Sequence, residues 1–178
     1  GSSTVGTVSG SGTFNYGYID TVEATAYNHY VFQQWSDNNT ENPRYIQVNG
    51  DITLTAQFGL ANYTLTLQVN NAAWGSVVGG GSFAYGTSQM IAAQSAQGYH
   101  FVQWSDGNTD NPRVLTIEDN LTLVATFAPN QYTVSVYSSD STKGTVSGGG
   151  TFDYGQQIYI IATPLGNYSF SQWSDGNT

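Results

Sequence analysis

The sequence predicts an all-β protein built as a tandem array of small β-repeat units. Aromatic residues make up 14% of the 178 residues, 13 of them Tyr, and the chain has 21 Gly. With abundant Thr and Val, this composition favours strands and tight turns, and we find no apolar period of 3.6 residues over a helical length. The strongest observation is repetition. Trp35, Trp104 and Trp173 are spaced by 69 residues (104−35 and 173−104), and the same spacing holds for Phe14/83/152, Tyr16/85/154, Gly17/86/155 and Asp37/106/175.

One unit can be followed from residue 63 to residue 127. Its first strand is expected at 63–69, where apolar and polar residues alternate strictly. The glycine-rich segment 75–86 is predicted to be hairpin-like, because glycine permits tight bends at little steric cost. A second alternating run follows around Ile91 and Ala93.

An aromatic strand is expected next, at residues 99–104. Tyr99 and Phe101 fall on one face, whereas Trp104 falls on the other unless the strand is irregular. We therefore expect either a bulge near Gln103 or a Trp104 that closes the end of the core. The segment 105–112 is a turn by composition.

The last two strands are expected at 113–117 and 121–127, with a turn at Asp119-Asn120. The repeat register then divides the chain into three units: 1–58, which lacks its first strand; 63–127, which is complete; and 132–178, which lacks its last two strands. The segments 59–62 and 128–131 are expected to be short linkers. Uncovered strand edges at the two ends predict end-to-end self-association or loosely ordered terminal units.

Charge and composition exclude several functions. Three basic residues against 12 acidic ones give a net charge of −9, which argues against binding to nucleic acid or to an anionic membrane surface. The absence of Cys excludes disulfides, thiolate metal sites and thiol catalysis. No apolar run is long enough for a transmembrane helix, so membrane insertion is not expected.

The repeated motifs resemble a known family. The run Gly-Thr-Val-Ser-Gly-Gly-Gly-Thr-Phe-Asp-Tyr-Gly at 144–155, the aromatic segment ending in Trp-Ser-Asp-Gly-Asn-Thr, and the Asn-Pro-Arg at 111–113 resemble the divergent branch of the internalin B-type repeats. The resemblance covers nearly the whole chain. It implies non-catalytic units on secreted or surface-anchored bacterial proteins, acting as stalks, spacers or adhesive elements, and a β-grasp-like topology, here without a helix. It provides no catalytic residues to transfer.

The acidic turns are the first candidate for chemistry. Asp37, Asp106 and Asp175 recur in an Asn-rich turn that could offer oxygen ligands to Ca²⁺. The turn lacks the rhythm of an EF-hand loop, so we favour Asp and Asn as caps that bond nearby backbone N–H groups. Arg44 and Arg113 share one repeat position, and we expect each to pair with the Asp of the turn or stack on its Trp rather than recognise a sugar or carboxylate.

Other polar residues give weaker indications. The glycine-rich segments lack the following helix and the Lys of a phosphate-binding loop. Carboxylates that recur in every unit do not form the single asymmetric constellation of a glycosidase. His29, His100 and Lys143 have no equivalents in the other units, and we expect the histidines to be surface residues. We therefore assign no catalytic, cofactor-binding or metal-binding residue.

The aromatic residues divide into two groups. Those that recur at fixed strand positions are expected to form the core, because small domains bury little else. The remaining aromatic residues are better candidates for ligand contact: Tyr18, Tyr27, Tyr45, Trp74, Tyr137 and Tyr159.

These observations favour a non-enzymatic, extracellular repeat module that acts as a stalk or spacer in a bacterial surface or secreted protein. Its expected partners are neighbouring repeats and domains of a larger parent protein. The alternatives left open are an adhesive module that binds a glycan or a host or bacterial surface protein, and a filament subunit formed by strand exchange.

Overall fold

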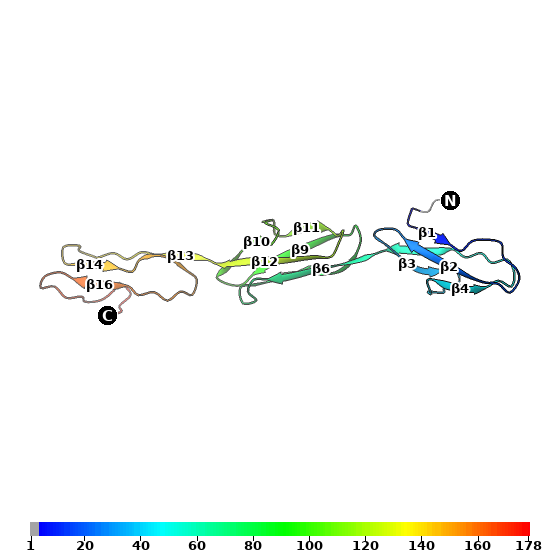
Figure 1. Ribbon diagram of the computed structural model, residues 1–178. Coiled ribbons are helices and arrows are strands. Elements are labelled where there is room, and N and C mark those ends of the chain that lie inside the picture. Colours follow the sequence, from blue (N-terminus) through cyan, green and yellow to red (C-terminus); the bar gives the residue numbers. More distant parts are fainter. Residues whose placement is uncertain (1–3) are drawn as a thin grey trace. The chain divides into compact units, whose positions relative to one another are not determined.

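A computed structural model describes residues 4–178, and every regular element in this range is a β-strand (Figure 1). Residues 1–3 of the expected first unit lie outside the described residues. In the first repeat the strands are β1 (Gly6–Ser9), β2 (Ile19–Ala26), β3 (Tyr30–Trp35), β4 (Arg44–Gln47) and β5 (Ala56–Leu60). In the middle repeat they are β6 (Asn62–Val69), β7 (Gly75–Val78), β8 (Gly81–Ala84), β9 (Ser88–Ser95), β10 (Tyr99–Trp104), β11 (Arg113–Thr116) and β12 (Leu121–Pro129). In the third repeat they are β13 (Gln131–Val134), β14 (Gly144–Ser147), β15 (Gly150–Asp153) and β16 (Ile161–Pro164).

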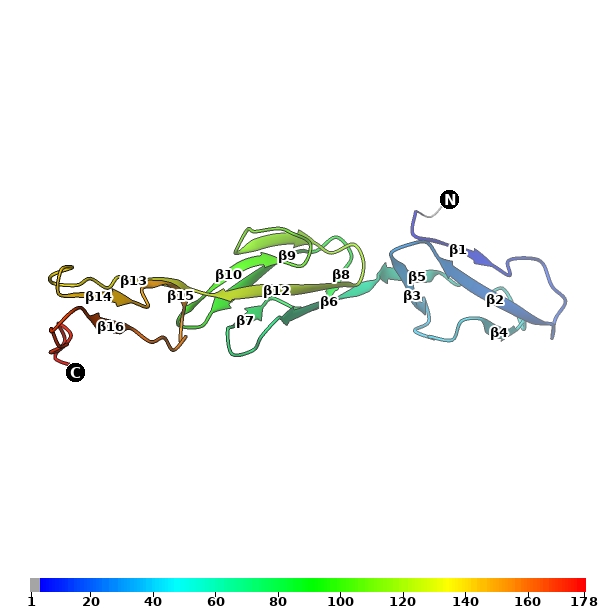
Figure 2. The same ribbon diagram turned by 60° about the vertical axis from the view of Figure 1, so that its left-hand side comes forward.

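The middle repeat contributes two sheets, whose strands are labelled in Figures 1 and 2. One has the strand order β10-β12-β6-β8 and the other β11-β9-β7. The described residues of the first repeat form a sheet β1-β2-β4, which matches β7-β9-β11, and a two-stranded sheet β3-β5, which matches β10-β12. The third repeat has the pairs β13-β15 and β14-β16. The all-β, tandem-repeat prediction is confirmed.

The glycine-rich segment 75–86 is a crossover, so the prediction of a hairpin-like region was wrong. Its two strands do not pair with each other, because β7 pairs with β9 whereas β8 pairs with β6. Gly79 lies at the change of sheet with φ +103, and a Cβ there would lie 2.3 Å from the carbonyl oxygen of Met90. Only glycine tolerates both this backbone conformation and this approach.

The bulge expected near Gln103 is confirmed. The pairing of β10 with β12 shifts register between Phe101 and Gln103, and β3 shifts in the same way against β5. An extra residue in one strand reverses the alternation of faces beyond it. The rings of Phe101 and Trp104 therefore meet on one side of the sheet, with centroids 5.5 Å apart.

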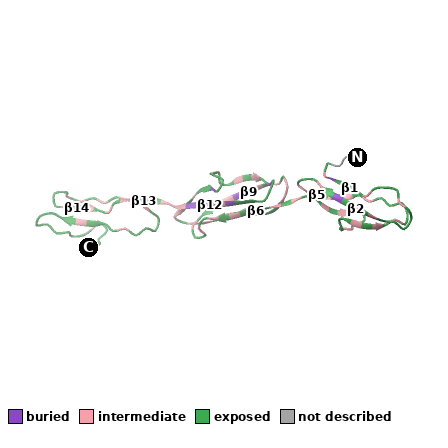
Figure 3. Cartoon of the chain, in the orientation of Figure 1, coloured by how far each residue is buried: buried purple, intermediate pink, exposed green. Residues whose placement is uncertain are grey.

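The described core follows the repeat register. Trp35 and Trp104 are both 0% exposed, and Phe101 is half-buried. Phe127 contacts Gly75 so closely that a Cβ on this glycine would lie 2.5 Å from the ring. The other buried apolar residues are Ala24, Leu65, Ile91, Ala93, Ile117, Leu123 and Ala125. As Figure 3 shows, buried positions lie on β9, β12 and the first-repeat strands, whereas in the third repeat the described residues are half-buried or exposed.

By contacts, the chain divides into two compact units. The first comprises residues 1–67, 79–91 and 112–123, and the second 68–78, 92–111 and 124–178. Residues of the middle repeat belong to both units, so the compact units do not coincide with the repeats. The predicted bounds 1–58, 63–127 and 132–178 describe the repeat of the sequence and stay a prediction.

The boundaries between repeats are not loops, in contrast to the linkers expected at 59–62 and 128–131. Within the first unit, β5 ends at Leu60 and β6 begins at Asn62. The residue between them, Ala61, donates its N–H to the carbonyl of His29 and accepts from the N–H of Tyr85. Within the second unit, Asn130 makes the same two bonds with Gly98 and Tyr154. Strand therefore continues from one repeat into the next with one hydrogen-bonded residue between.

Candidate functional site

The recurring aspartates cap the turn that follows the aromatic strand. The carboxylate of Asp106 accepts the N–H of Asn108, and the side chain of Asn108 accepts the N–H of Asp110. The indole Nε1 of Trp104 then donates to the carbonyl oxygen of Asp110 at 3.1 Å. The same pattern recurs after Trp35, and Asp175 caps Asn177. The oxygens considered for Ca²⁺ thus hold the turn that anchors the buried indole, while the prediction of no metal site stays a prediction.

Arg44 forms the expected ion pair across this turn. Its Nη1 lies 2.7 Å from one carboxylate oxygen of Asp37 and 2.8 Å from the other. The hydrogen bond from Arg44 is the main reason why the pKa of Asp37 is lowered from its ordinary value. The structural role favoured for Arg44 therefore has direct support, with an exposed carboxylate as its partner.

Asparagines before the recurring prolines have a role that the sequence analysis missed. The N–H of Ala93 donates to Asn111 Oδ1 at 2.8 Å, and Asn111 Nδ2 donates to the Ala93 carbonyl at 2.7 Å. Asn42 makes the same two bonds with Ala24. The side-chain amide therefore takes the place of a strand partner for Ala93 or Ala24, two residues before β11 or β4 begins. The recurrence of Asn-Pro-Arg at 42–44 and 111–113 was the available signal.

His29 is not the surface residue expected. Its imidazole is half-buried, stacks on Tyr85 with centroids 3.8 Å apart, and its Nδ1 lies 3.0 Å from the hydroxyl of Tyr63. The equivalent position in the next repeat is Gly98, which leaves room for Tyr154. A Cβ on Gly98 would lie 2.1 Å from Cδ1 of the Tyr154 ring. His29 therefore fills space at the first boundary that a tyrosine ring fills at the second.

The remaining singular residues are exposed. His100 Nδ1 lies 3.0 Å from the side-chain oxygen of Asn130 at the surface. Lys143 pairs with Asp140 at 2.8 Å. The hydrogen bond from Lys143 is the largest cause that lowers the pKa of Asp140 to about 2, and the same bond raises the pKa of Lys143.

The aromatic residues that do not recur are mostly exposed, as expected of ligand-contact candidates. Trp74 is the exception, because it is half-buried and stacks on Tyr99 with centroids 5.2 Å apart. The exposed ones, with their exposed fractions, are Tyr18 (52%), Tyr27 (45%), Tyr45 (74%), Tyr137 (84%) and Tyr159 (85%).

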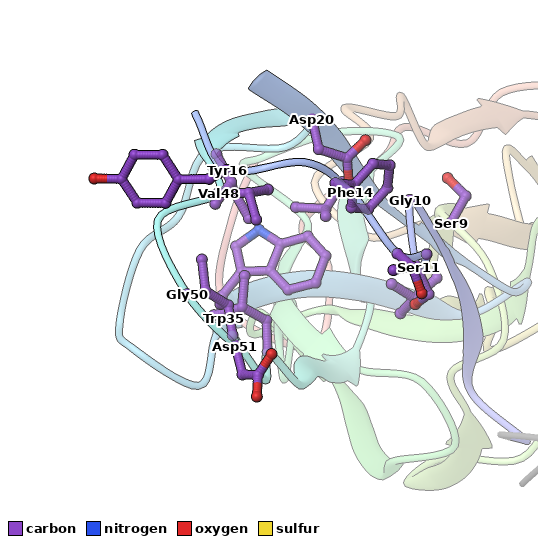
Figure 4. A pocket seen from close by; sticks show the side chains of 17 residues that line it. Ser9, Gly10, Ser11, Phe14, Tyr16, Asp20, Trp35, Val48, Gly50 and Asp51 are labelled. Atoms are coloured by element: carbon purple, nitrogen blue, oxygen red, sulfur yellow. The ribbon is translucent and has the colours of Figure 1, made fainter. Parts of the chain in front are cut away.

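The first repeat also contains a groove lined by both polar and apolar residues, with a volume of about 500 Å³. Its lining includes Phe14, Val22, Trp35, Val48 and Leu54. Figure 4 shows the Trp35 indole between the segment 9–14 and the segment 48–51, with the side chain of Tyr16 directed away from it. Sequence reasoning did not identify this groove as a site.

The family comparison agrees with this repeated architecture. The family described as the divergent InlB B-repeat domain matches the chain three times, over residues 2–62, 65–131 and 132–178. The chain belongs to this family. No curated protein and no solved structure matched. Divergent InlB B-repeats are associated with bacterial surface proteins and are generally non-catalytic. In the described part of this repeat protein, no helix is long and apolar enough to cross a membrane.

Proposed function

We propose that this chain is a non-catalytic spacer in an extracellular or surface-attached bacterial protein, holding neighbouring domains at a defined separation. The observation that carries the proposal is the continuous strand at each repeat boundary. A single residue, Ala61 or Asn130, separates the strands there, and its backbone is hydrogen-bonded on both sides. A boundary of this kind has few rotatable bonds left free, which is the property that a spacer needs.

Side chains support the same property. At the first boundary, His29 lies against Tyr85 and within hydrogen-bonding distance of Tyr63. At the second, Tyr154 makes an edge contact with Tyr99, with centroids 5.7 Å apart. Each contact joins residues of one repeat to residues of the next. Membership of a family associated with bacterial surface proteins supports the extracellular location.

The test uses distances between equivalent positions. Thr7, Ser76 and Thr145 are exposed and stand one repeat apart, and the chain has no Cys that would compete for a thiol-directed spin label. Cysteines introduced in pairs at 7 and 76, or at 76 and 145, should give one narrow distance distribution each by pulsed electron resonance. Three glycines inserted after Ala61 should broaden the first distribution and leave the second unchanged. Broad distributions in the parent chain would refute the spacer role.

The exposed tyrosines favour a second candidate, an adhesive role. Tyr45 is 74% exposed and Tyr159 85% exposed, and exposed aromatic rings stack well on sugar faces. Binding to a glycan array that is lost in Tyr45→Ala or Tyr159→Ala, with the narrow distances retained, would establish adhesion in addition to spacing.

A further inference from the structure

The turn after β4 contains the one place in the sequence where glycine follows asparagine, Asn49-Gly50. Both residues are exposed. In residues 4–178, no hydrogen bond holds the side chain of Asn49 or the N–H of Gly50. The middle repeat has Glu118 and Asp119 at the equivalent positions, and they are exposed as well although β6 is present there. The exposure is therefore a property of this turn in both repeats.

The Asp-Gly pair in the turn after β10 is held in a different way. Gly107 donates its N–H to the carbonyl of Trp104 at 2.9 Å, and the carboxylate of Asp106 accepts the N–H of Asn108. The third repeat has the same two bonds in its own turn. The backbone nitrogen of the glycine and the side chain before it are thus both fixed, which keeps them from approaching each other. In the turn after β4 neither group is fixed.

We propose that Asn49 is a site of spontaneous deamidation. The deprotonated backbone nitrogen of Gly50 attacks Cγ of the Asn49 side chain, and a succinimide ring closes. The side-chain nitrogen leaves as ammonia, and the proton that the Gly50 N–H gave up reaches it through the solvent. Water then adds to one of the ring carbonyls, and the ring opens to aspartate or to isoaspartate.

Glycine at position 50 favours the attack, because it has no Cβ to hinder ring closure. Apart from its chain neighbours, nothing lies within 4 Å of where a Cβ on Gly50 would be, so the surroundings leave the turn free to rotate. Asparagine is itself among the thermolabile residues of proteins. Composition, exposure and the absence of restraining bonds therefore converge on this one pair.

The product changes the charge of the turn and part of its backbone. Each event replaces a neutral amide by a carboxylate, so the net charge changes from −9 to −10 (−9 − 1). The middle repeat already has a carboxylate, that of Glu118, at this position. Isoaspartate also adds a methylene to the main chain between residues 49 and 50. Because Val48 is bonded to Gly17 and Tyr18, we expect the added length to stay in the turn and leave β4 in place.

The test follows the intact chain during incubation in mildly alkaline buffer, which favours the deprotonated amide. Trypsin then releases the peptide 45–113, and fragmentation locates isoaspartate, which marks opening of the ring. We expect isoaspartate and aspartate to accumulate at position 49, and the intact chain to move to a more acidic band in isoelectric focusing. Asn49→Asp provides the reference band. Gly50→Ala should lose most of the conversion, and its backbone lies outside the left-handed region, so the variant should fold.

Asp106→Asn gives the matched control, because it creates a second Asn-Gly pair in a turn whose backbone is held. Tryptophan fluorescence checks that this variant is folded, and Asp175→Asn repeats the control in the third repeat. We expect little isoaspartate at position 106 in the folded chain, and formation at both 49 and 106 in urea. Absence of isoaspartate at position 49 in the folded chain, an undiminished rate in Gly50→Ala, or equal rates at 49 and 106 in folded Asp106→Asn would each overturn the proposal.

Discussion

Replacing Asn111 by alanine tests how much the side chain of this asparagine stabilises β9 beyond the residues that pair with β11. Asn111 satisfies both the N–H and the carbonyl of Ala93, at 2.8 and 2.7 Å, and Ala93 is only 7% exposed. A backbone group left buried without a partner costs about 1–3 kcal/mol. Water can reach this edge in part. Loss of both hydrogen bonds in Asn111→Ala should therefore lower the free energy of unfolding by about 2–4 kcal/mol.

The measurement is urea unfolding followed by tryptophan fluorescence, with exchange of the Ala93 amide as the local readout. Asn111→Asp retains an acceptor for the Ala93 N–H but loses the donor to the Ala93 carbonyl. It should therefore lower the free energy of unfolding less than Asn111→Ala and leave the Ala93 amide partly protected from exchange. Asn42→Ala should reproduce the effect at Ala24 in the first repeat. Asn49→Ala, at an exposed position, is the control. The reasoning fails if Asn111→Ala costs no more than Asn49→Ala, or if the Ala93 amide keeps its protection.

Three further predictions follow from the core, the turns and the exposed ion pair. Trp104→Ala should lower the free energy of unfolding by about 3–5 kcal/mol, the usual range for a large buried aromatic, and an unchanged melting temperature would refute the core assignment. Millimolar Ca²⁺ should leave the melting temperature unchanged, and an increase that Asp106→Ala abolishes would contradict the capping role of the turn. The pKa of Asp140 is lowered from 3.8 to about 2, so its pair with Lys143 contributes stability above pH 3.8 that is lost as the pH falls toward 2. Asp140→Asn should therefore reduce the loss of melting temperature between pH 5 and pH 2, and an identical loss in both proteins would refute this contribution.

The sequence predicted the parts of the fold that are set by local periodicity. Alternation placed the strand at 63–69, and the mismatch between Phe101 and Trp104 predicted the bulge, because a side chain cannot reach the same face without one extra residue. It did not predict which strands are neighbours around the glycine-rich segment 75–86. Glycine at Gly79 permits the bend of a hairpin and the change of sheet equally well, and the choice depends on residues distant in the sequence.

The candidate site was predictable only where a recurring residue acts within its own turn. Asp106 caps a segment two residues away, so composition was sufficient. Asn111 acts on Ala93, 18 residues earlier, and its recurrence before proline was visible although its partner was not. His29 was misjudged because it has no repeat equivalent, and its contacts with Tyr63 and Tyr85 come from the next repeat. The groove lies in the repeat for which the register indicates a missing first strand, but the residues that line it are brought together only by the fold.

The pairing of β6 with β12 has a mechanical consequence. The N–H of Thr64 donates to the side chain of Asn120, and that of Asn70 donates to the carbonyl of Ala125, so the two strands run in the same direction. Because β5 leads into β6 and β12 leads into β13, a pull on the chain enters the middle repeat at the start of β6 and leaves at the end of β12. The load then slides two parallel neighbours past each other. We therefore expect the bonds between β6 and β12 to be loaded together rather than one after another.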